Sequence, residues 1–349
     1  MRKRETAAGW HLRPLLAALA IAFALPASAQ ESASAFYPGK TVRLIVGYPP
    51  GTVYDTYTRM MARHYTKHLP GKPTGIVQNM PGAGGLNAIV YATNVAAADG
   101  LQMAISAPQN STDLLLDPSN AKYDPRRVAW IGSVSSETGA CVFWHGKGKT
   151  IGDLRAREHV LGTTGGPTAG TSLEGKALEA LLGLKFKYIS GYRSTVDIRL
   201  AADKNEVDGV CGLATSTILR DMDALLKNGT IAVPIQTGLI SNPGFAKVPT
   251  VLDLVKTQEE RQILTLIFGP AAYFRPFVTS GATPPDRVAA LRAAFDATMK
   301  DPEFLDDMQK AQLDVRPLTG AQVAAQVEEI YKTPPHVVER TRKILGFVP

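Results

Sequence analysis

The residues best suited to chemistry in this chain lie in four loops rich in Gly, Ser, Thr and Pro. They are YPPGTVYD (48–55), NMPGAGG (79–85), Ser106–Gln109 and GGPTAGTS (165–172). Each one follows a predicted strand, and exposed N–H groups in such loops can hold an anion. Each loop alone could be ordinary turn chemistry, since Gly and Pro mark turns generally. Together they predict a cleft lined with main-chain donors and small hydroxyls, which suits binding a carboxylate more than converting one.

Strands and helices that would position these loops can be recognised around the first pair. Thr41–Val46 is a β-branched apolar run that predicts a strand, and Ile76 and Val77 predict a second one. Between them, Tyr54, Tyr57, Met61 and Tyr65 recur at three- and four-residue steps, which indicates a helix. Loops at the carboxyl ends of neighbouring strands in an open α/β sheet share one crevice, where ligands usually bind.

Strands alternate with helices at about 41–106 and again at about 160–236. This alternation predicts parallel sheets built from βαβ units, and its repetition predicts two α/β lobes. A strand is expected over Ala271–Val278, and the segment after it reads as mostly helical. The expected helices are 286–299, 302–312, 320–332 and 335–345.

The amino-terminal segment predicts the compartment, and the charge pattern argues against nucleic acid as a partner. Residues 1–29 combine a basic start, an apolar run at Leu15–Leu25 and the small-residue site Ala27-Ser28-Ala29, as in a cleaved signal peptide. We therefore expect export to the periplasm and a mature chain beginning near Gln30, with no later span. Losing four basic residues and one acidic residue lowers the formal charge from +7 to +4. No Lys/Arg block remains, which argues against nucleic acid.

Two cysteines, Cys141 and Cys211, would enter this oxidising compartment. Both lie in apolar, strand-like contexts, where a disulfide and two buried thiols are both compatible with the sequence. Geometry decides between them.

Enzyme and metal signatures are incomplete. Gly170–Glu174 resembles a nucleophile elbow except that Glu replaces the last Gly. Gly82-Ala83-Gly84 begins a dinucleotide fingerprint whose third Gly position is Asn87. His64 and His68, four apart on a predicted helix, could share a metal but lack the Glu of HExxH, which favours solvated surface histidines. No enzyme, metal or cofactor is expected.

Motifs spread over the whole mature chain resemble a known family, the Bug-type solute-binding receptors that serve tripartite tricarboxylate transporters. The matching stretches are YPGKTVRLIV (37–46), PPGxxxD (49–55), NMPGAGG (79–85), DG (99–100), GYRS (191–194), EVDG (206–209), VPT (248–250) and TPPDRV (283–288).

The resemblance implies an α/β fold, the two-lobe type II clamshell of periplasmic binding proteins, with each lobe a mostly parallel sheet flanked by helices. We expect lobe 1 over 36–108, lobe 2 over 109–230 and a return to lobe 1 over 231–349. The implied function is capture of a small organic acid, especially a di- or tricarboxylate, by a monomer without cofactor that contacts membrane permease subunits transiently. Two alternatives are a binding module for a sensor kinase and an exported hydrolase using the same cleft.

The resemblance also implies site residues. In the family the first two loops hold one carboxylate and the start of a lobe-two helix holds the far end of the ligand. Tyr48, Tyr54 and Ser106 complete the expected lining, and Arg193 is the expected side-chain cation, with a surface arginine as its alternative. The residues carried over are Gly51 and Asp55, Pro81, Gly82, Ala83 and Gly84, and Thr168, Gly170, Thr171 and Ser172.

The first loop departs from the family pattern, which is usually PPGGGxD. Thr52 and Val53 occupy the later Gly positions, and β-branched residues tolerate neither positive φ nor close backbone approach well. An altered loop conformation, and with it an altered ligand, is therefore expected.

Overall fold

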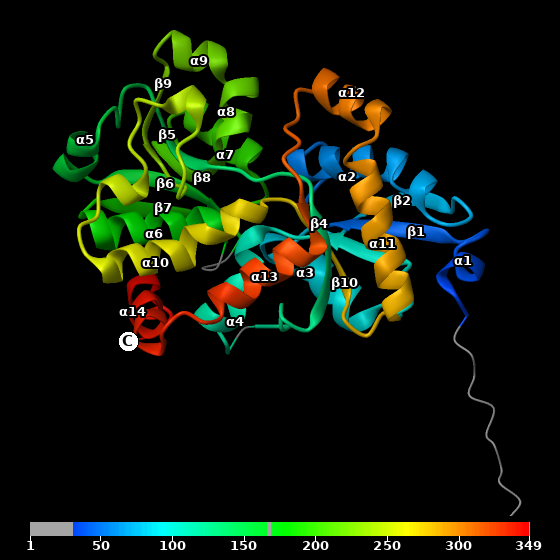
Figure 1. The fold of residues 1–349 in the computed structure, drawn as a ribbon. Coiled ribbons are helices and arrows are strands. Elements are labelled where there is room, and N and C mark those ends of the chain that lie inside the picture. Colours follow the sequence, from blue (N-terminus) through cyan, green and yellow to red (C-terminus); the bar gives the residue numbers. More distant parts are fainter. Residues whose placement is uncertain (1–30, 120, 166–168, 349) are drawn as a thin grey trace, which may run out of the picture. The chain divides into compact units, whose positions relative to one another are not determined.

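Two mixed β-sheets, each flanked by helices, organise the chain (Figure 1). The computed structural model describes residues 31–119, 121–165 and 169–348. The first sheet has the order β11-β4-β10-β3-β1-β2 and the second β7-β6-β8-β5-β9. The strands are β1 (Thr41–Val46), β2 (Thr74–Asn79), β3 (Gln102–Ile105), β4 (Val128–Ser133), β5 (Gly139–Trp144), β6 (His159–Thr164), β7 (Phe186–Tyr192), β8 (Gly209–Ala214), β9 (Ile231–Gln236), β10 (Pro276–Ser280) and β11 (Leu318–Thr319).

The two sheets share one topology. In the first, β1 pairs in parallel with β2 and β3, and in the second β6 pairs in parallel with β7 and β8. Beyond β3 in the first sheet lies β10, which pairs antiparallel with β3 and with β4. Beyond β8 in the second sheet lies β5, which pairs antiparallel with β8 and with β9. The expected α/β clamshell architecture is confirmed, but the expectation of mostly parallel sheets is wrong: in each sheet only two of the described strand pairings are parallel, and the others are antiparallel.

Helices cover both sheets, and none among the described residues is long and apolar enough to cross a membrane. Beside the first sheet lie α1 (Ala33–Phe36), α2 (Val53–His64), α3 (Leu86–Val90), α11 (Pro285–Thr298), α12 (Pro302–Lys310) and α13 (Gly320–Ile330). Beside the second lie α5 (Ile151–Ala156), α6 (Gly170–Leu182), α7 (Thr195–Asp203), α8 (Thr215–Asp221), α9 (Asp223–Lys227), α10 (Gln258–Phe268) and α14 (Pro335–Leu345), with α4 (Asp113–Leu116) against α14.

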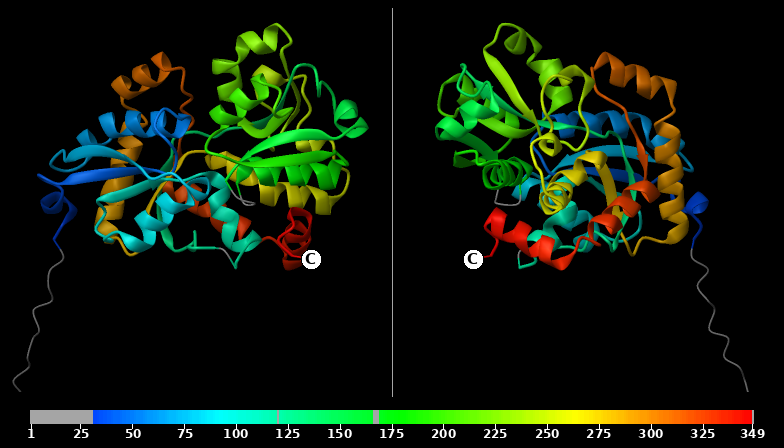
Figure 2. Two further views of the ribbon diagram at one scale, coloured as in Figure 1. Left: turned by 180° about the vertical axis from the view of Figure 1, so that it is seen from behind. Right: turned by 60° about the vertical axis from the view of Figure 1, so that its left-hand side comes forward.

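Sheet membership differs from the expected lobe boundaries at two strands. β4 belongs to the first sheet although it falls within 109–230, and β9 belongs to the second although it falls after 230. Helices α10 and α14 also pack on α6, as both views of Figure 2 show for the red C-terminal helix beside yellow α10. Local hydrophobic patterns predict that a strand forms, but they do not say which sheet it joins.

The core explains why the first elements form where they were predicted. Val42, Leu44, Ile45 and Val46 of β1 are all buried, as expected for a parallel strand covered on both faces. The aromatic stripe of α2 packs on this sheet, and Tyr65 just beyond it donates a hydrogen bond of 2.9 Å to the carbonyl of a residue in α11. The three- and four-residue spacing therefore marked a buried helix face.

Some elements and boundaries differ from those predicted, and the largest differences lie between residues 258 and 276. The strand expected over Ala271–Val278 begins only at Pro276. Residues 269–273 form a 3₁₀ helix instead, with Pro270 in its first turn. Helix α10 was not predicted, although Thr257 and Glu260 form a capping box at its start.

Cys141 on β5 and Cys211 on β8 form a disulfide, with both residues fully buried. The two strands are antiparallel neighbours, and their register shifts at Cys141. The question that the sequence left open is thus decided by strand pairing, which places the two side chains side by side.

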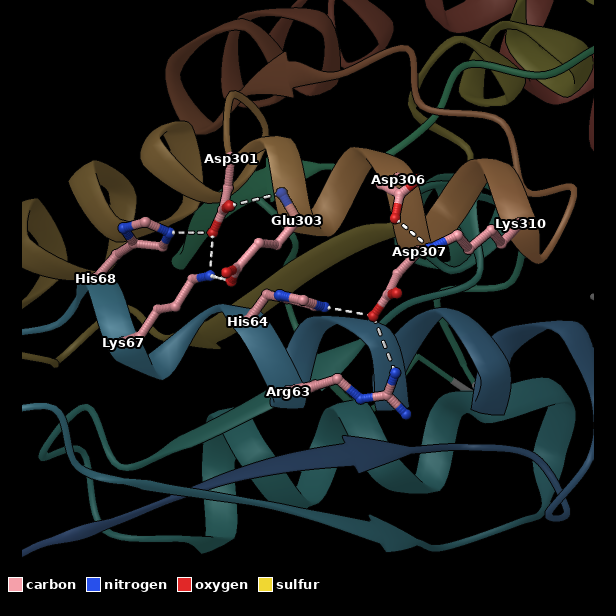
Figure 3. Close-up of polar contacts among 9 residues, drawn as sticks. All are labelled: Arg63, His64, Lys67, His68, Asp301, Glu303, Asp306, Asp307 and Lys310. Atoms are coloured by element: carbon pink, nitrogen blue, oxygen red, sulfur yellow. Dashed lines mark hydrogen bonds and ion pairs between the residues drawn. The ribbon is translucent and has the colours of Figure 1, made fainter.

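A network of ion pairs joins α2 and the short helix after it to α12 (Figure 3). His64 Nε2 and Arg63 each lie 2.9 Å from the Asp307 carboxylate, and His64 is buried. The expectation of solvated surface histidines is therefore wrong for His64, whose ring also packs edge-on against Phe304.

The second half of this network surrounds Asp301, which is also the N-cap of α12. Its carboxylate lies 2.6 Å from Lys67 Nζ and 2.9 Å from His68 Nε2, and Lys67 also reaches Glu303 at 2.6 Å. Ligand atoms of His64, Asp301 and Glu303 lie within 4.8 Å of one another, close enough for a metal ion. The Lys67 ammonium already bonds both carboxylates, so the cluster is complete as an ion-pair network.

We predict that replacing both cysteines with serine destabilises the fold. The disulfide closes a separation of 70 residues, and removing such a constraint on the unfolded chain costs about 4 kcal/mol. Urea unfolding with and without reductant should show this loss in the wild type and no effect of reductant on the double variant. Two titratable thiols in the unreduced, denatured wild type would contradict the bridge.

Asp301→Ala should destabilise the protein because it removes the α12 cap, worth about 1 kcal/mol, together with the ion pairs to α2. Asp306→Ala is the matched control, since Asp306 on the same helix pairs only with exposed Lys310. Equal thermal unfolding midpoints for the two variants would show that the network contributes nothing beyond surface charge.

The same variant should change the response to acid. Burial alone would raise the pKa of Asp301, but bonds from Lys67, His68 and the Glu303 N–H lower it well below its ordinary value. A carboxyl whose pKa is lowered on folding stabilises the folded state fully above its ordinary pKa of about 4. This stabilisation is lost as the pH falls from there to the folded-state pKa. Unfolding midpoints measured from pH 6 to pH 3 should therefore fall less steeply for Asp301→Ala than for the wild type.

Candidate functional site

One cavity is lined from both sheets by residues that follow β1, β2, β3, β6, β7 and β8, which are the parallel strands of the two sheets. Its volume is about 120 Å³. A single bound water needs roughly 10–15 Å³, so this space fits a small organic molecule. The described lining residues include Tyr48, Thr52, Val53, Tyr54, Gly84, Ala107, Gln109, Asn110, Thr164, Ala169, Gly170, Thr171, Ser194, Thr195, Val196, Arg199, Gly212, Leu213, Ala214, Thr217, Asp221, Phe274 and Arg275.

Four of the described α-helices begin at this cavity, and one of them, α8 with its N-cap Ala214, has its start occupied by the Glu137 carboxylate, which accepts from the Ser216 N–H. The N-cap residues of the other three are Thr52 for α2, Ala169 for α6 and Ser194 for α7, and all three line the cavity. The N-terminus of a helix carries partial positive charge and unsatisfied N–H groups. Helices α2 and α7 have an aspartate in the first turn, whereas α6 has no acidic residue there and no described side-chain cap. The α6 end is therefore the position best prepared for an external anion.

An aromatic wall lies beside these helix starts. The rings of Tyr48 and Tyr54 are stacked with centroids 4.6 Å apart, and the Tyr48 hydroxyl donates to the Gly84 carbonyl at 2.9 Å. Burial raises the pKa of Tyr48 and raises that of Tyr54 to about 12, so both hydroxyls are protonated at neutral pH. Val53 and Phe274 add apolar surface, which suits the carbon skeleton of a ligand.

Asp55 organises the first loop and does not line the cavity. Its buried carboxylate accepts hydrogen bonds from the Gly51 N–H at 2.9 Å, Arg59 Nε at 2.9 Å and Asn79 Nδ2 at 2.8 Å. Burial would raise its pKa, but these bonds and the Arg59 charge lower the pKa overall. Asp55 thereby ties the loop after β1 to the end of β2, and its direct contact with a ligand stays a prediction.

The departure from the usual glycine-rich loop has a simple structural basis. Gly51 has φ of 81°, a left-handed conformation that favours glycine. Thr52 has φ of −74° and caps α2 by accepting from the Asp55 N–H, and Val53 is the first helical residue. Because neither needs positive φ, β-branched side chains fit here and bring a hydroxyl and a methyl surface to the cavity.

The structure brings five of the expected residues to the cavity and places most of the others nearby. Those at the lining are Tyr48, Tyr54, Gly84, Gly170 and Thr171. Outside it lie Gly51, Asp55, Pro81, Gly82, Ala83, Ser106, Ser172 and Arg193, and Thr168 lies outside the described residues.

Among the expected site residues, Arg193 lies most clearly away from the cavity. Its side chain is 80% exposed and pairs with Asp197 one helical turn on, at 3.1 Å. The surface alternative therefore describes Arg193, and the cations at the cavity are Arg199 and Arg275. Arg199 interacts with Asp221, which it approaches at 3.8 Å.

Several lining residues were missed by sequence reasoning. Ser194 and Thr195 carry a recognisable signal, since Ser is a preferred N-cap directly before a helix. Asn110, Thr164 and Arg275 carry none, because each reaches the cavity only through the way its segment packs.

We predict that Asp55→Ala lowers the free energy of unfolding by about 2–3 kcal/mol, since it leaves partly buried donors of Gly51 and Asn79 unpaired. Asp197→Ala removes a first-turn aspartate whose ion pair is exposed, and it serves as control. Urea unfolding measures both. An unchanged midpoint for Asp55→Ala would contradict the organising role.

Comparison with known proteins places this geometry in context. No protein-family model matches the chain. Protein BugT of Bordetella pertussis is 37% identical over 93 residues, which are 27% of this chain and 28% of BugT. The matched segment thus spans little more than a quarter of that relative.

Solved structures match over most of the chain. The periplasmic binding protein BugD has a TM-score of 0.65 at 20% identity, covering 88% of this chain and 98% of BugD. MatC from Rhodopseudomonas palustris, solved with bound malate, has a TM-score of 0.66 at 16% identity, covering 88% of this chain and all of MatC. At these identities the likeness establishes the fold.

This two-lobe α/β chain is thus similar in sequence to a part of the protein BugT and shares its fold with BugD and MatC.

Proposed function

We propose that the protein is a periplasmic receptor that captures a small organic acid for a tripartite tricarboxylate-type transporter. The observation that carries the proposal is the meeting of three helix N-termini in one small cavity with an aromatic wall. A carboxylate fits the helix ends because it accepts several N–H bonds and is attracted by the helix dipole. The malate bound to MatC is a ligand of this chemistry.

Binding in this proposal involves no bond breaking. The ligand contacts loops of both sheets at once, so it binds more tightly when the two groups of loops are close together. Two crossover segments, 134–138 and 269–275, connect the sheets and form backbone hydrogen bonds with each other, such as Phe274 N–H to the Ser135 carbonyl at 2.9 Å. These segments are suited to act as the hinge of a closing motion.

The remaining parts of the proposal concern location and partners. The amino-terminal sequence supports export, and the proposed partners are membrane permease subunits that receive the loaded receptor transiently. We propose a monomer that works without cofactor or nucleic acid.

A panel of acids tests the proposal. Malate, succinate, adipate, citrate and benzoate should be compared with the neutral diamide of succinate by thermal shift and titration calorimetry. At least one acid should stabilise the fold, by about 2.7 kcal/mol at a concentration one hundred times its dissociation constant, and the diamide should not. A flat response across all acids would rule the proposal out.

Gly170→Ala provides a matched variant. A methyl group there would meet the Gln109 side chain at 2.8 Å and occupy the start of α6, so affinity for the acid should fall at least tenfold. Gly152→Ala is the control, because its methyl group would meet only Thr150 Oγ1, at 3.5 Å. Equal affinities for both variants would place the ligand elsewhere.

A further inference from the structure

Arg275 presents a guanidinium with incomplete hydrogen bonding at the cavity. It lies directly before β10, is 1% exposed and belongs to the cavity lining. Its NH1 donates to Ser135 Oγ at 2.7 Å, and its buried Nε has no partner among the described residues. A guanidinium offers five N–H donors. At least one N–H donor of this buried cation, the one on Nε, is therefore unused among the described residues.

Aromatic rings hold the guanidinium in place. Its central carbon lies 4.1 Å from the Tyr57 ring centroid, 4.9 Å from that of Phe274 and 5.9 Å from that of Tyr54. Such stacking fixes the plane of the group without using its N–H donors. An arriving planar acid group would thus meet a pre-oriented pair of donors.

The nearest carboxylate, Glu137, does not satisfy Arg275. Glu137 Oε2 lies 3.9 Å from NH1, too far for a hydrogen bond. The Glu137 carboxylate instead accepts from Thr215 Oγ1 at 2.8 Å, from Ser216 Oγ at 2.5 Å and from the Thr138 N–H at 3.2 Å. It is committed to the start of α8 and balances the Arg275 charge only at a distance.

We propose that Arg275 binds an acid group of the ligand directly and makes the receptor prefer ligands with two acid groups. The inference rests on the proposed function: one acid group occupies the helix starts, and the second pairs with Arg275. An arginine keeps its charge, and the buried Glu137 carboxylate at 3.9 Å balances that charge without forming a hydrogen bond to it. The ligand supplies the hydrogen bonds that the protein leaves open.

A purely structural role predicts different behaviour. The hinge segments are held together by backbone atoms, including Val134 N–H to the Arg275 carbonyl at 3.3 Å. The Arg275 N–H also donates to Ser133 Oγ at 3.3 Å. Every side chain at position 275 except proline keeps these bonds, so substitution should leave the hinge paired.

The test compares diacids with monoacids of the same length. Succinate with butyrate, and adipate with hexanoate, are titrated calorimetrically into the wild type, Arg275→Gln and Arg275→Lys. Arg275→Gln should lower diacid affinity about 10- to 100-fold, the range for a hydrogen bond to a charged group, and monoacid affinity less than threefold. Arg275→Lys, which keeps the charge but loses the fork, should lie between Gln and wild type.

Two control variants sharpen the result. Arg193→Gln makes the same change at an exposed ion pair and should leave both affinities within twofold of the wild type. Glu137→Gln removes the distant negative charge while keeping an acceptor for Ser216, so diacid affinity should stay the same or rise. If Arg275→Gln fails to fold, Glu137→Gln still tests the proposal. A tenfold fall in the diacid affinity of Glu137→Gln would contradict direct binding of the acid group by Arg275.

The remaining outcomes are separable. A wild type that binds no acid defeats the proposed function itself. A wild type that binds diacids, with Arg275→Gln reducing diacid and monoacid affinity equally or not at all, overturns only the role of Arg275. Arg199 is the competing cation at the cavity. A selective loss of diacid affinity in Arg199→Gln alone would also overturn the role of Arg275.

Discussion

Parallel strands oblige the chain to return along a connection on the face of the sheet, and this obligation brings the next helix to start near the carboxyl edge. The loops after β1, β2, β3, β6, β7 and β8 all open onto the same cavity for that reason. The positive ends of α2, α6 and α7 follow from strand direction before any side chain is chosen. The partial positive charge at this place is thus a property of the fold, which individual residues then refine.

Side chains divide this refinement between two sets. Asp55 is buried, takes three hydrogen bonds from neighbouring loops and stays charged, so it holds the first loop without touching the cavity. Tyr48 and Tyr54 line the cavity with apolar surface and neutral hydroxyls. Asp55 therefore positions the first loop, and its neighbours Tyr48 and Tyr54 line the cavity.

Two buried ionisable groups, Glu174 on α6 and Arg275 before β10, illustrate how burial acts on different side chains. Burial raises the pKa of Glu174 to about 8, so this carboxyl is neutral at pH 7 and avoids the cost of a buried charge. Arg275 has no such option, because its guanidinium remains protonated in proteins. Ser135 and the aromatic rings of Tyr57 and Phe274 meet part of its needs. An acidic ligand would meet the rest.

The sequence by itself determined most elements and the position of the binding loops. β1 and α14 have the expected limits, and the Gly-rich loops occur at the strand ends where they were predicted. Turn residues, helix caps and hydrophobic periodicity are local signals, so one sequence suffices to recognise them. The same signals gave the α/β class and the likeness to Bug-type receptors.

Tertiary structure alone decided which distant segments meet. Cys141 and Cys211 form a bridge because β5 and β8 pair, and β4 and β9 join sheets that their own sequences do not specify. Arg193 sits on a surface turn, whereas Arg275 reaches the cavity from the hinge, about 80 residues further on. The physical reason is common to all of these cases: strand pairing and charge burial depend on neighbours that are remote in the chain, and local patterns carry no record of them.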